Sequence, residues 1–268
     1  MNKNWIIEVD ITHRCNLKCR HCNRLCNEEK DYFTQRDCLF MREAHIDYLC
    51  SQIKKYPIGK VKMIRILGGE PLLSPIIHYA IEKFNTLKVE NVINEICIMS
   101  NGTITVPEDL KQYIINYPPK VKELFAKKGK LMASEVYEAK EEKHLNITVS
   151  PSDFDELVDN ICDRYIGCGI HYTVYGFSLT APCFPSIFVF PENHKYFRRD
   201  LPPTVKDFCD ANFLKSVCSR CVYGLKTRDT MEEKLYDSSY MGGQWAKQIR
   251  KNALWGFREP DINWINEI

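Results

Sequence analysis

The sequence lacks the features of a membrane or exported protein, and it lacks a strong charge of either sign. No run approaches the ~18–20 apolar residues of a membrane span, and no apolar segment typical of a signal peptide follows Met1. Lys and Arg number 37 against 35 Asp and Glu, so the net charge of +2 favours neither nucleic acid nor a membrane surface as partner. Repeats at the period of a solenoid are also absent. We therefore expect a cytoplasmic protein with no nucleic-acid and no membrane partner.

Cysteine, by contrast, is abundant. The 268 residues include 13 cysteines, an odd number that excludes complete internal disulfide pairing. In a cytoplasmic chain, clustered cysteines indicate a metal site or catalysis before disulfides. Cysteines cluster over residues 15–26 and 209–221, whereas the scattered ones fit small buried side chains, as at Cys38, Cys50, Cys97 and Cys162.

Apolar patterns predict alternating strands and helices along the first two thirds of the chain. Runs rich in β-branched and aromatic residues predict strands at residues 5–11, 61–67, 95–99, 145–149 and 170–177. Helical spacing and capping signals predict helices over 41–56, from Ser74-Pro75, from Pro107 to Ile115 and from Ser152. Residues 120–144 are rich in Lys and Glu without a clear apolar face, which indicates a solvated insertion or lid.

This alternation predicts an α/β fold, a partial (β/α)6 TIM-type barrel whose active groups lie on loops after the strands. From about residue 180 the pattern changes to Pro, Cys and charge. We therefore expect a core over residues 1–179 and a small Cys-rich C-terminal module over residues 180–268. A hairpin over residues 169–182 is an alternative to a single strand at 170–177.

Cys15, Cys19 and Cys22 form a C-x3-C-x2-C loop directly after the first predicted strand. Such short spacings let one loop supply three thiolates to an iron–sulfur cluster, and three ligands leave the fourth iron open to a substrate or cofactor. A zinc site is the alternative, with Cys26 or a histidine as the fourth ligand.

Two further motifs follow the second and third predicted strands. Residues 68–71, Gly-Gly-Glu-Pro, combine glycines that allow close approach to the backbone with a carboxylate that can receive an ammonium group. Residues 100–102, Ser-Asn-Gly, follow the next strand. Each alone also fits a plain turn or an Asx turn. Because the carboxyl ends of parallel strands meet at one edge, all three motifs are expected to converge on one pocket.

Residues 11–22 closely resemble the cluster loop of radical S-adenosylmethionine (SAM) enzymes, particularly the branch with the molybdenum-cofactor cyclase and peptide- and sugar-modifying enzymes. Residues 67–71 look like that family's Gly-Gly-Glu motif, and residues 100–102 resemble its third-strand motif. The resemblance implies that a [4Fe-4S] cluster is held by Cys15, Cys19 and Cys22. It also implies SAM contacts at His21, Gly68, Gly69, Glu70, Ser100, Asn101 and Ser150.

The chemistry implied by this resemblance is reductive cleavage of SAM. The reduced cluster passes one electron to the sulfonium, and a 5'-deoxyadenosyl radical abstracts hydrogen from the substrate. The protein contributes positioning and exclusion of water. An external one-electron donor such as flavodoxin or ferredoxin is an expected partner.

Residues 176–184 resemble the hairpin that precedes the auxiliary cluster in radical SAM enzymes with C-terminal "SPASM" or shorter "twitch" modules. The chain has too few C-terminal cysteines for two extra clusters, so the resemblance implies one auxiliary [4Fe-4S] cluster, with ligands Cys183, Cys209, Cys218 and Cys221. Cys168 is the alternative to Cys183 if residues 169–182 form a hairpin. A structural zinc at the last three cysteines is the alternative to a cluster.

The expected reaction is hydrogen abstraction from a small-molecule or sugar substrate, as a two-electron oxidation assisted by the auxiliary cluster. Radical modification of a peptide by oxidation, cross-linking or epimerisation is second, because the chain has no room for the leader-binding domain of many peptide modifiers. Candidates for substrate contacts are His171, Tyr172, Tyr175, His194 and Arg198, although a strand rich in Tyr more often belongs to the core. A non-catalytic iron–sulfur or zinc-stapled protein is the alternative of a different class, and it leaves residues 68–70 and 100–102 unexplained.

Overall fold

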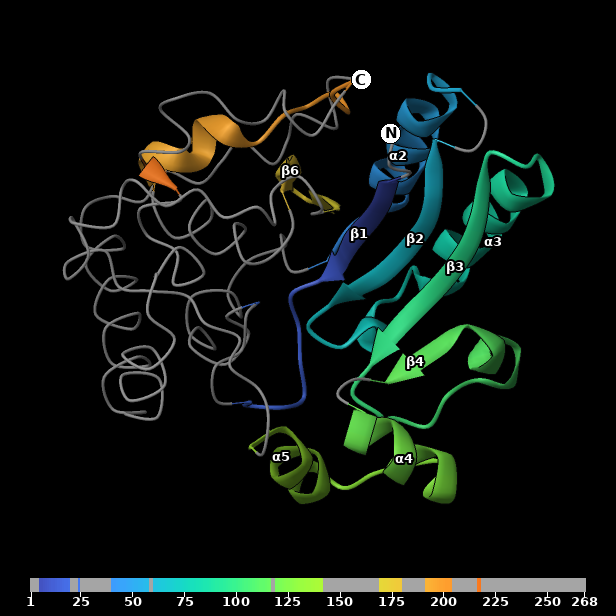
Figure 1. Cartoon of the computed structure of the whole chain (residues 1–268), viewed down its shortest axis with the longest axis vertical. Helices are drawn as coiled ribbons and strands as arrows, with labels where there is room; N and C mark the ends of the chain where they lie inside the picture. Colours follow the sequence, from blue (N-terminus) through green and yellow to red (C-terminus); the bar gives the residue numbers. More distant parts are fainter. Residues whose placement is uncertain are drawn as a thin grey trace.

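A computed structural model of the protein describes residues 5–19, 24, 40–57, 60–116, 119–141, 169–179, 191–203 and 216–217. Its centre is a six-stranded sheet with the strand order β4-β3-β2-β1-β5-β6 (Figure 1). The strands are β1 (Trp5–Thr12), β2 (Val61–Gly68), β3 (Ile93–Ser100), β4 (Ile114–Asn116), β5 (Ile170–Thr173) and β6 (Gly176–Leu179). All neighbours pair in parallel except β5 and β6, so the fold is α/β with a mostly parallel sheet, as the sequence predicted.

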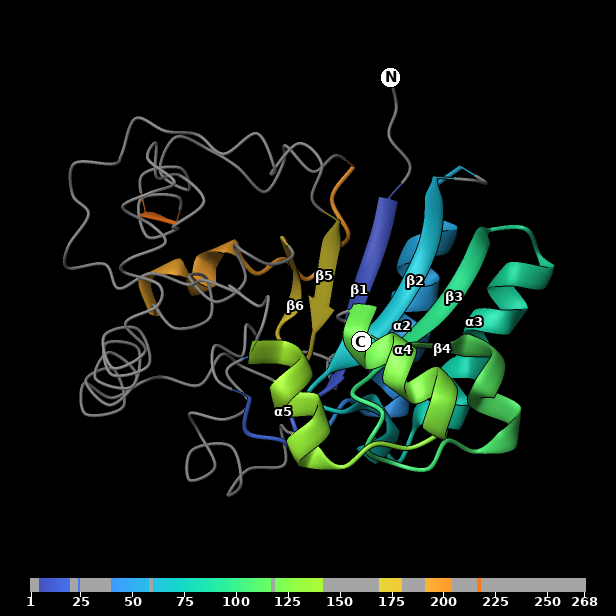
Figure 2. The same cartoon turned by 60° about the horizontal axis from the view of Figure 1, so that its bottom comes forward.

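Two pairs of helices accompany the sheet. The first pair, α2 (Glu43–Lys54) and α3 (Ile77–Val89), covers one face, and the second, α4 (Pro119–Lys128) and α5 (Ala133–Glu141), lies near the carboxyl ends of the parallel strands (Figures 1 and 2). Short 3-10 helices are η2 (Pro71–Leu73), η3 (Glu108–Tyr113) and η6 (Pro191–Tyr196). Among the helices that the structure describes, none combines the length and the apolar character needed to cross a bilayer.

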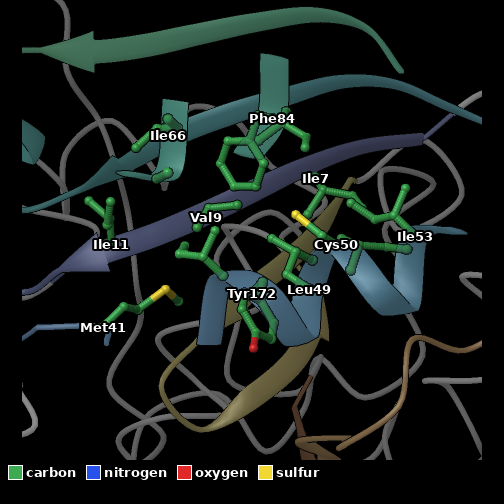
Figure 3. Packing of buried hydrophobic residues seen from close by; sticks show 14 of the residues in the cluster. Ile7, Val9, Ile11, Met41, Leu49, Cys50, Ile53, Ile66, Phe84 and Tyr172 are labelled. Carbon is green, nitrogen blue, oxygen red and sulfur yellow. The ribbon is translucent and has the colours of Figure 1, made fainter. Parts of the chain in front are cut away.

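The core lies between the sheet and the helices α2 and α3. Ile7, Val9 and Ile11 alternate along β1, are fully buried, and pack on this side of the sheet with Leu49 of α2 and Phe84 of α3 (Figure 3). Side chains two positions apart on a strand lie on the same face, so the alternation of apolar and polar residues along β1 produces one continuous apolar surface. Each such side chain contributes roughly 1.5–3 kcal/mol of burial free energy, which is what fixes the helices on the sheet.

The opposite face of the same strands carries charge. Glu8 and Asp10 alternate with the apolar residues of β1, and Glu8 pairs with Arg65 of β2 at 2.9 Å. His171 of β5 lies 2.8 Å from Asp10. The sheet therefore separates an apolar layer under the helices from a buried polar layer on its other side.

The region after β3 differs from the prediction of a helix from Pro107 to Ile115. A 3-10 helix, η3, ends at Tyr113, and β4 follows it and pairs with β3 through Ile98 and Ile114. The β-branched pair Ile114-Ile115 favours extended backbone, and pairing with β3 supplies its hydrogen bonds. The expected helix cap at Ser74 is also wrong, because Ser74 ends η2 and α3 begins at Ile77.

The prediction that residues 120–144 form a solvated insertion or lid is wrong for the part that the structure describes. The helices α4 and α5 and the segment between them bury Val121, Leu131, Val136 and Ala139 in one cluster with Leu17 of the cysteine loop. Only a few small apolar residues per helix make this contact, so the many Lys and Glu residues around them concealed it in the sequence.

Residues 170–177 do not form the single strand that was the first expectation. A turn at Val174-Tyr175 divides them into the hairpin β5–β6, which is the alternative that the sequence left open. Gly176 is the reason, since its φ of +105° suits glycine and an added Cβ would lie 2.5 Å from the Arg198 carbonyl oxygen. The predicted strand at 145–149 and the helix from Ser152 lie outside the described residues.

Candidate functional site

The cysteine loop is attached to the end of β2 by backbone hydrogen bonds. The amide of Gly69 donates to the Thr12 carbonyl at 2.8 Å, and the amide of Glu70 donates to the Arg14 carbonyl at 2.7 Å. A Cβ on Gly68 would lie 2.1 Å from the Thr12 oxygen, and one on Gly69 would lie 2.0 Å from the Arg14 oxygen. The two glycines are therefore required because the backbone that leads into Cys15 passes directly against them.

Glu70 connects the end of β2 to the end of β3. Its carboxylate is fully buried, and it accepts hydrogen bonds from the amide of Asn101 at 2.8 Å and from the amide of Leu72 at 3.2 Å. Burial raises the pKa of the Glu70 carboxyl, and its hydrogen bonds and the charge of Lys140 oppose this rise. A buried carboxylate that accepts two backbone amides fixes the geometry of both segments.

Asn101 connects β3 to the cysteine loop. Its side-chain amide donates to Asn16 Oδ1 at 3.0 Å, and its oxygen accepts from the amide of Thr103 at 2.9 Å. Asn16 in turn donates to Thr103 Oγ1 at 2.7 Å. Together with Glu70, this network joins the three motifs that follow β1, β2 and β3 at one edge of the sheet.

The sulfur atoms of Cys15 and Cys19 lie near N–H donors. Cys15 Sγ lies 3.4 Å from the amide of Leu17 and 3.9 Å from Asn101 Nδ2, and Cys19 Sγ lies 3.3 Å from Lys140 Nζ. Donors of this kind stabilise sulfur as a thiolate, the form that binds iron. The donor set around these two residues therefore suits an iron–sulfur cluster.

The polar face of the sheet holds a buried ionic cluster next to this loop. Arg24 donates to Glu8 at 2.7 Å and lies 3.5 Å from Asp10, while His171 Nε2 lies 2.8 Å from both Asp10 and Arg24. Arg24 follows Cys22 by two positions in the sequence. These ion pairs therefore anchor the far side of the cysteine loop to β1.

The pKa directions of the two carboxylates in this ionic cluster agree with charges paired to Arg24, whereas that of His171 favours the neutral imidazole. Burial alone would raise the pKa of Asp10, but Arg24 and then His171 outweigh it and lower the pKa to about 2. Burial likewise opposes ionisation of Glu8, and Arg24 is the main partner that lowers its pKa. For His171, burial is the largest cause and lowers the pKa, because the charged form loses its hydration.

The candidate substrate contacts do not gather in one place. Tyr172 is buried in the apolar core and donates to the His45 carbonyl at 2.9 Å. Tyr175 is buried against Phe197, His194 also neighbours Phe197, and Arg198 is exposed, with its backbone paired to Phe177. His171 alone joins the polar face. Their roles toward a substrate stay predictions.

The remaining predicted site residues lie outside the described part of the chain. These are His21, Cys22, Ser150, Cys168, Cys183, Cys209, Cys218 and Cys221. Within the residues that the structure describes, no group of three His, Cys, Asp or Glu side chains is arranged as a metal site, and the third cysteine of the loop is not among those residues. Both predicted cluster assignments stay predictions.

Sequence reasoning missed several residues that hold the site together. Asn16, Thr103, Arg24, Tyr137 and Lys140 all contact the cysteine loop or its anchor. The alternation of Glu8 and Asp10 with buried isoleucines was a usable signal, because charged residues inside a buried strand need partners. Lys140 gave no signal, since lysines are common throughout its segment.

Comparison with known proteins agrees with this arrangement. Residues 9–118 match the model of the Radical SAM superfamily. The GTP 3',8-cyclase of Rhizobium etli is 30% identical over 97 residues, which cover 36% of this chain and 25% of that protein. The enzyme of the same name from Clostridium perfringens is 30% identical over 100 residues, covering 37% and 27%. The chain thus matches about a quarter of the length of these relatives.

The matched segment contains the cysteine loop, the two motifs that follow β2 and β3, and the strands that bring all three together. Proteins of this superfamily use a [4Fe-4S] cluster and SAM. Residues 9–118 are therefore similar in sequence to the Radical SAM superfamily.

Proposed function

We propose that this protein is a radical SAM enzyme in which Cys15, Cys19 and Cys22 hold a [4Fe-4S] cluster. SAM binds beside it, at the ends of β2 and β3. The observation that supports this most directly is the chain of hydrogen bonds from the cysteine loop through Glu70 to Asn101, because it brings three separate sequence motifs to one place. When bound, the cluster and SAM supply one-electron cleavage of SAM and abstraction of hydrogen from a substrate.

The described side chains suit a supporting role in this chemistry. Gly68 and Gly69 let the cysteine loop lie against β2, and Glu70 holds the amide of Asn101 in place. Both oxygens of Glu70 accept backbone amides, so its carboxylate acts first as a positioning group. In this proposal His21, Ser100 and Ser150 complete the contacts to SAM.

The reaction that we propose is a two-electron oxidation of a small-molecule or sugar substrate. In this proposal residues 1–179 are the catalytic core, built on the mostly parallel sheet, and the module over residues 180–268 holds an auxiliary [4Fe-4S] cluster that accepts the second electron. Its ligands are Cys183, Cys209, Cys218 and Cys221, with Cys168 as the alternative to Cys183. Radical modification of a peptide is the second candidate. The relatives are named for cyclisation of GTP, but the match to a quarter of their length does not extend that reaction to this chain.

Metal analysis tests the two clusters. Anaerobically reconstituted protein should hold roughly eight irons per chain, and changing Cys15, Cys19 and Cys22 together to Ala should remove about half of them. Cys50→Ala is the matched control, because burial raises the pKa of this thiol to about 12 and keeps it protonated inside α2. Zinc in place of iron would support the zinc-stapled alternative.

Product analysis tests the reaction. Reduced protein should convert SAM to methionine and 5'-deoxyadenosine, and Cys218→Ala should leave substrate-free cleavage largely intact. If the auxiliary cluster accepts the second electron, the same variant should form deoxyadenosine without matching product. If the module is only a structural staple, both activities and the melting temperature should fall together.

A further inference from the structure

The helix α5 contacts three consecutive residues of the cysteine loop. Leu17 lies in one buried apolar cluster with Val136 and Ala139. The amide of Lys18 donates to the hydroxyl of Tyr137 at 2.7 Å, and the ammonium of Lys140 lies 3.3 Å from Cys19 Sγ. Residues three and four apart share a face of a helix, so one face of α5 supplies all of these contacts.

The two described cysteines of the loop receive donors of different charge. Cys15 lies near neutral donors, the amide of Leu17 and the side chain of Asn101. Cys19 lies near a full positive charge, the ammonium of Lys140. Hydrogen bonds from charged donors are roughly twice as strong as those from neutral donors. The field of Lys140 also reaches Glu70, where it opposes the rise of the pKa caused by burial.

We propose that Lys140 raises the reduction potential of the cluster held by Cys15, Cys19 and Cys22. This inference rests on the proposed function, since it requires Cys19 to be a cluster ligand. An external donor adds one electron to the cluster, and no bond forms or breaks at Lys140. The added negative charge is shared with the ligand sulfurs, so a nearby ammonium stabilises the reduced state more than the oxidised state. Charge and hydrogen bonds at the sulfurs are established causes of potential shifts.

A redox titration monitored by electron paramagnetic resonance (EPR) tests this role. The signal of this cluster is identified as the one lost in the Cys15, Cys19, Cys22 triple Ala variant. In Lys140→Met, the ratio of reduced to oxidised cluster at a fixed potential should fall roughly tenfold, a shift of about 59 mV to more negative values. Lys140→Arg keeps the charge and should keep the potential. Lys122→Met, which removes an exposed lysine of α4, is the matched control and should also leave it unchanged.

Iron content separates failure of this inference from failure of the proposed function. If wild-type protein binds no iron at Cys15, Cys19 and Cys22, both are wrong. If Lys140→Met retains iron and titrates at the wild-type potential, the proposed function stands and the role of Lys140 is overturned. Should Lys140→Met lose part of its iron, the titration still decides, because the EPR signal comes only from molecules that carry the cluster. A shift shared by Lys140→Met and Lys122→Met would also overturn the specific role.

Discussion

The two faces of β1 are stabilised by different kinds of contact. On the helix face, Ile7, Val9 and Ile11 are fully buried among apolar side chains, and many interchangeable contacts share the stabilisation. On the other face, Glu8 and Asp10 depend on a few specific partners, chiefly Arg24 and His171. The helix face therefore supplies most of the stability of the folded domain. The polar face determines where the cysteine loop is held.

We expect the largest loss of stability from a substitution in the apolar core on the helix face. Phe84 of α3 is fully buried in the core under the helices, so Phe84→Ala leaves a cavity and should lower the free energy of unfolding by about 3–5 kcal/mol. Denaturant unfolding measures this loss, and iron per folded molecule should stay at the wild-type value. Reduced iron in the folded fraction would contradict the separation of the two faces.

The polar face predicts a smaller loss of stability with a direct effect on the loop. Asp10→Asn removes the carboxylate shared by Arg24 and His171 and should cost about 3 kcal/mol. Because Arg24 follows Cys22 by two positions, iron content should also fall. Parallel measurements of unfolding and bound iron check both effects, and an iron content equal to that of Phe84→Ala would contradict the anchoring role.

Buried histidines on both faces should make stability depend on pH, because burial lowers the pKa of His171 on the polar face as it does that of His45. His45 of α2 is buried on the helix side, and burial lowers its pKa from 6.5 to about 4. A proton then binds the unfolded chain but not the folded one, so stability falls as the pH drops from 6.5 toward 4, by roughly 2 kcal/mol at pH 5. The lowered pKa of Asp10 affects stability at lower pH. Its contribution is present above pH 3.8 and is lost as the pH falls toward 2.

His45→Gln isolates the first of these effects. Glutamine at the third helical position can accept the amide hydrogen bond that His45 accepts from Arg42, but it does not titrate. Between pH 7 and pH 5, the free energy of unfolding should therefore fall by about 2 kcal/mol less in His45→Gln than in the wild type. Equal losses in the two proteins would assign the pH dependence to other groups.

The contact of α5 with the loop predicts the smallest effect. Tyr137→Phe removes the acceptor of the Lys18 amide and should cost about 1 kcal/mol, with faster hydrogen exchange at Lys18. Tyr79→Phe is the control, because the hydroxyl of Tyr79 donates to an exposed Asp47. The loss of stability in this variant should stay within about 0.5 kcal/mol. Unchanged exchange at Lys18 would argue against α5 as a support of the loop.

The sequence predicted the parts of the fold that depend on local patterns. The strands β1, β2 and β3 and the helices α2 and α3 follow from apolar periodicity, and all five are confirmed. The strand β4 was missed because pairing with β3 stabilises its three residues, and no local pattern reveals such a partner. The position of β5 beside β1 was equally hidden, since strand order depends on contacts between distant segments.

The same distinction applies to the site. The glycines and Glu70 were predicted as one group with Ser100 and Asn101, and the structure brings them together at one edge of the sheet. Their attachment to the backbone of the cysteine loop was not foreseen, because it depends on a close approach that only coordinates reveal. Lys140 contacts the loop, and Arg24 contacts β1, through long side chains whose ends no sequence pattern can place.

The pairing of β1 with β5 bears on the order in which the protein acquires its structure during synthesis. The strand β2 precedes β5 by about a hundred residues in the sequence, so one edge of β1 can be covered earlier than the other. The other edge pairs with β5 between Ile7 and Ile170, and it stays open until the ribosome has made β5. An open strand edge is a template for pairing with other chains. The nascent protein is therefore exposed to aggregation until β5 is made, and the polar face, which needs His171, cannot be completed before then.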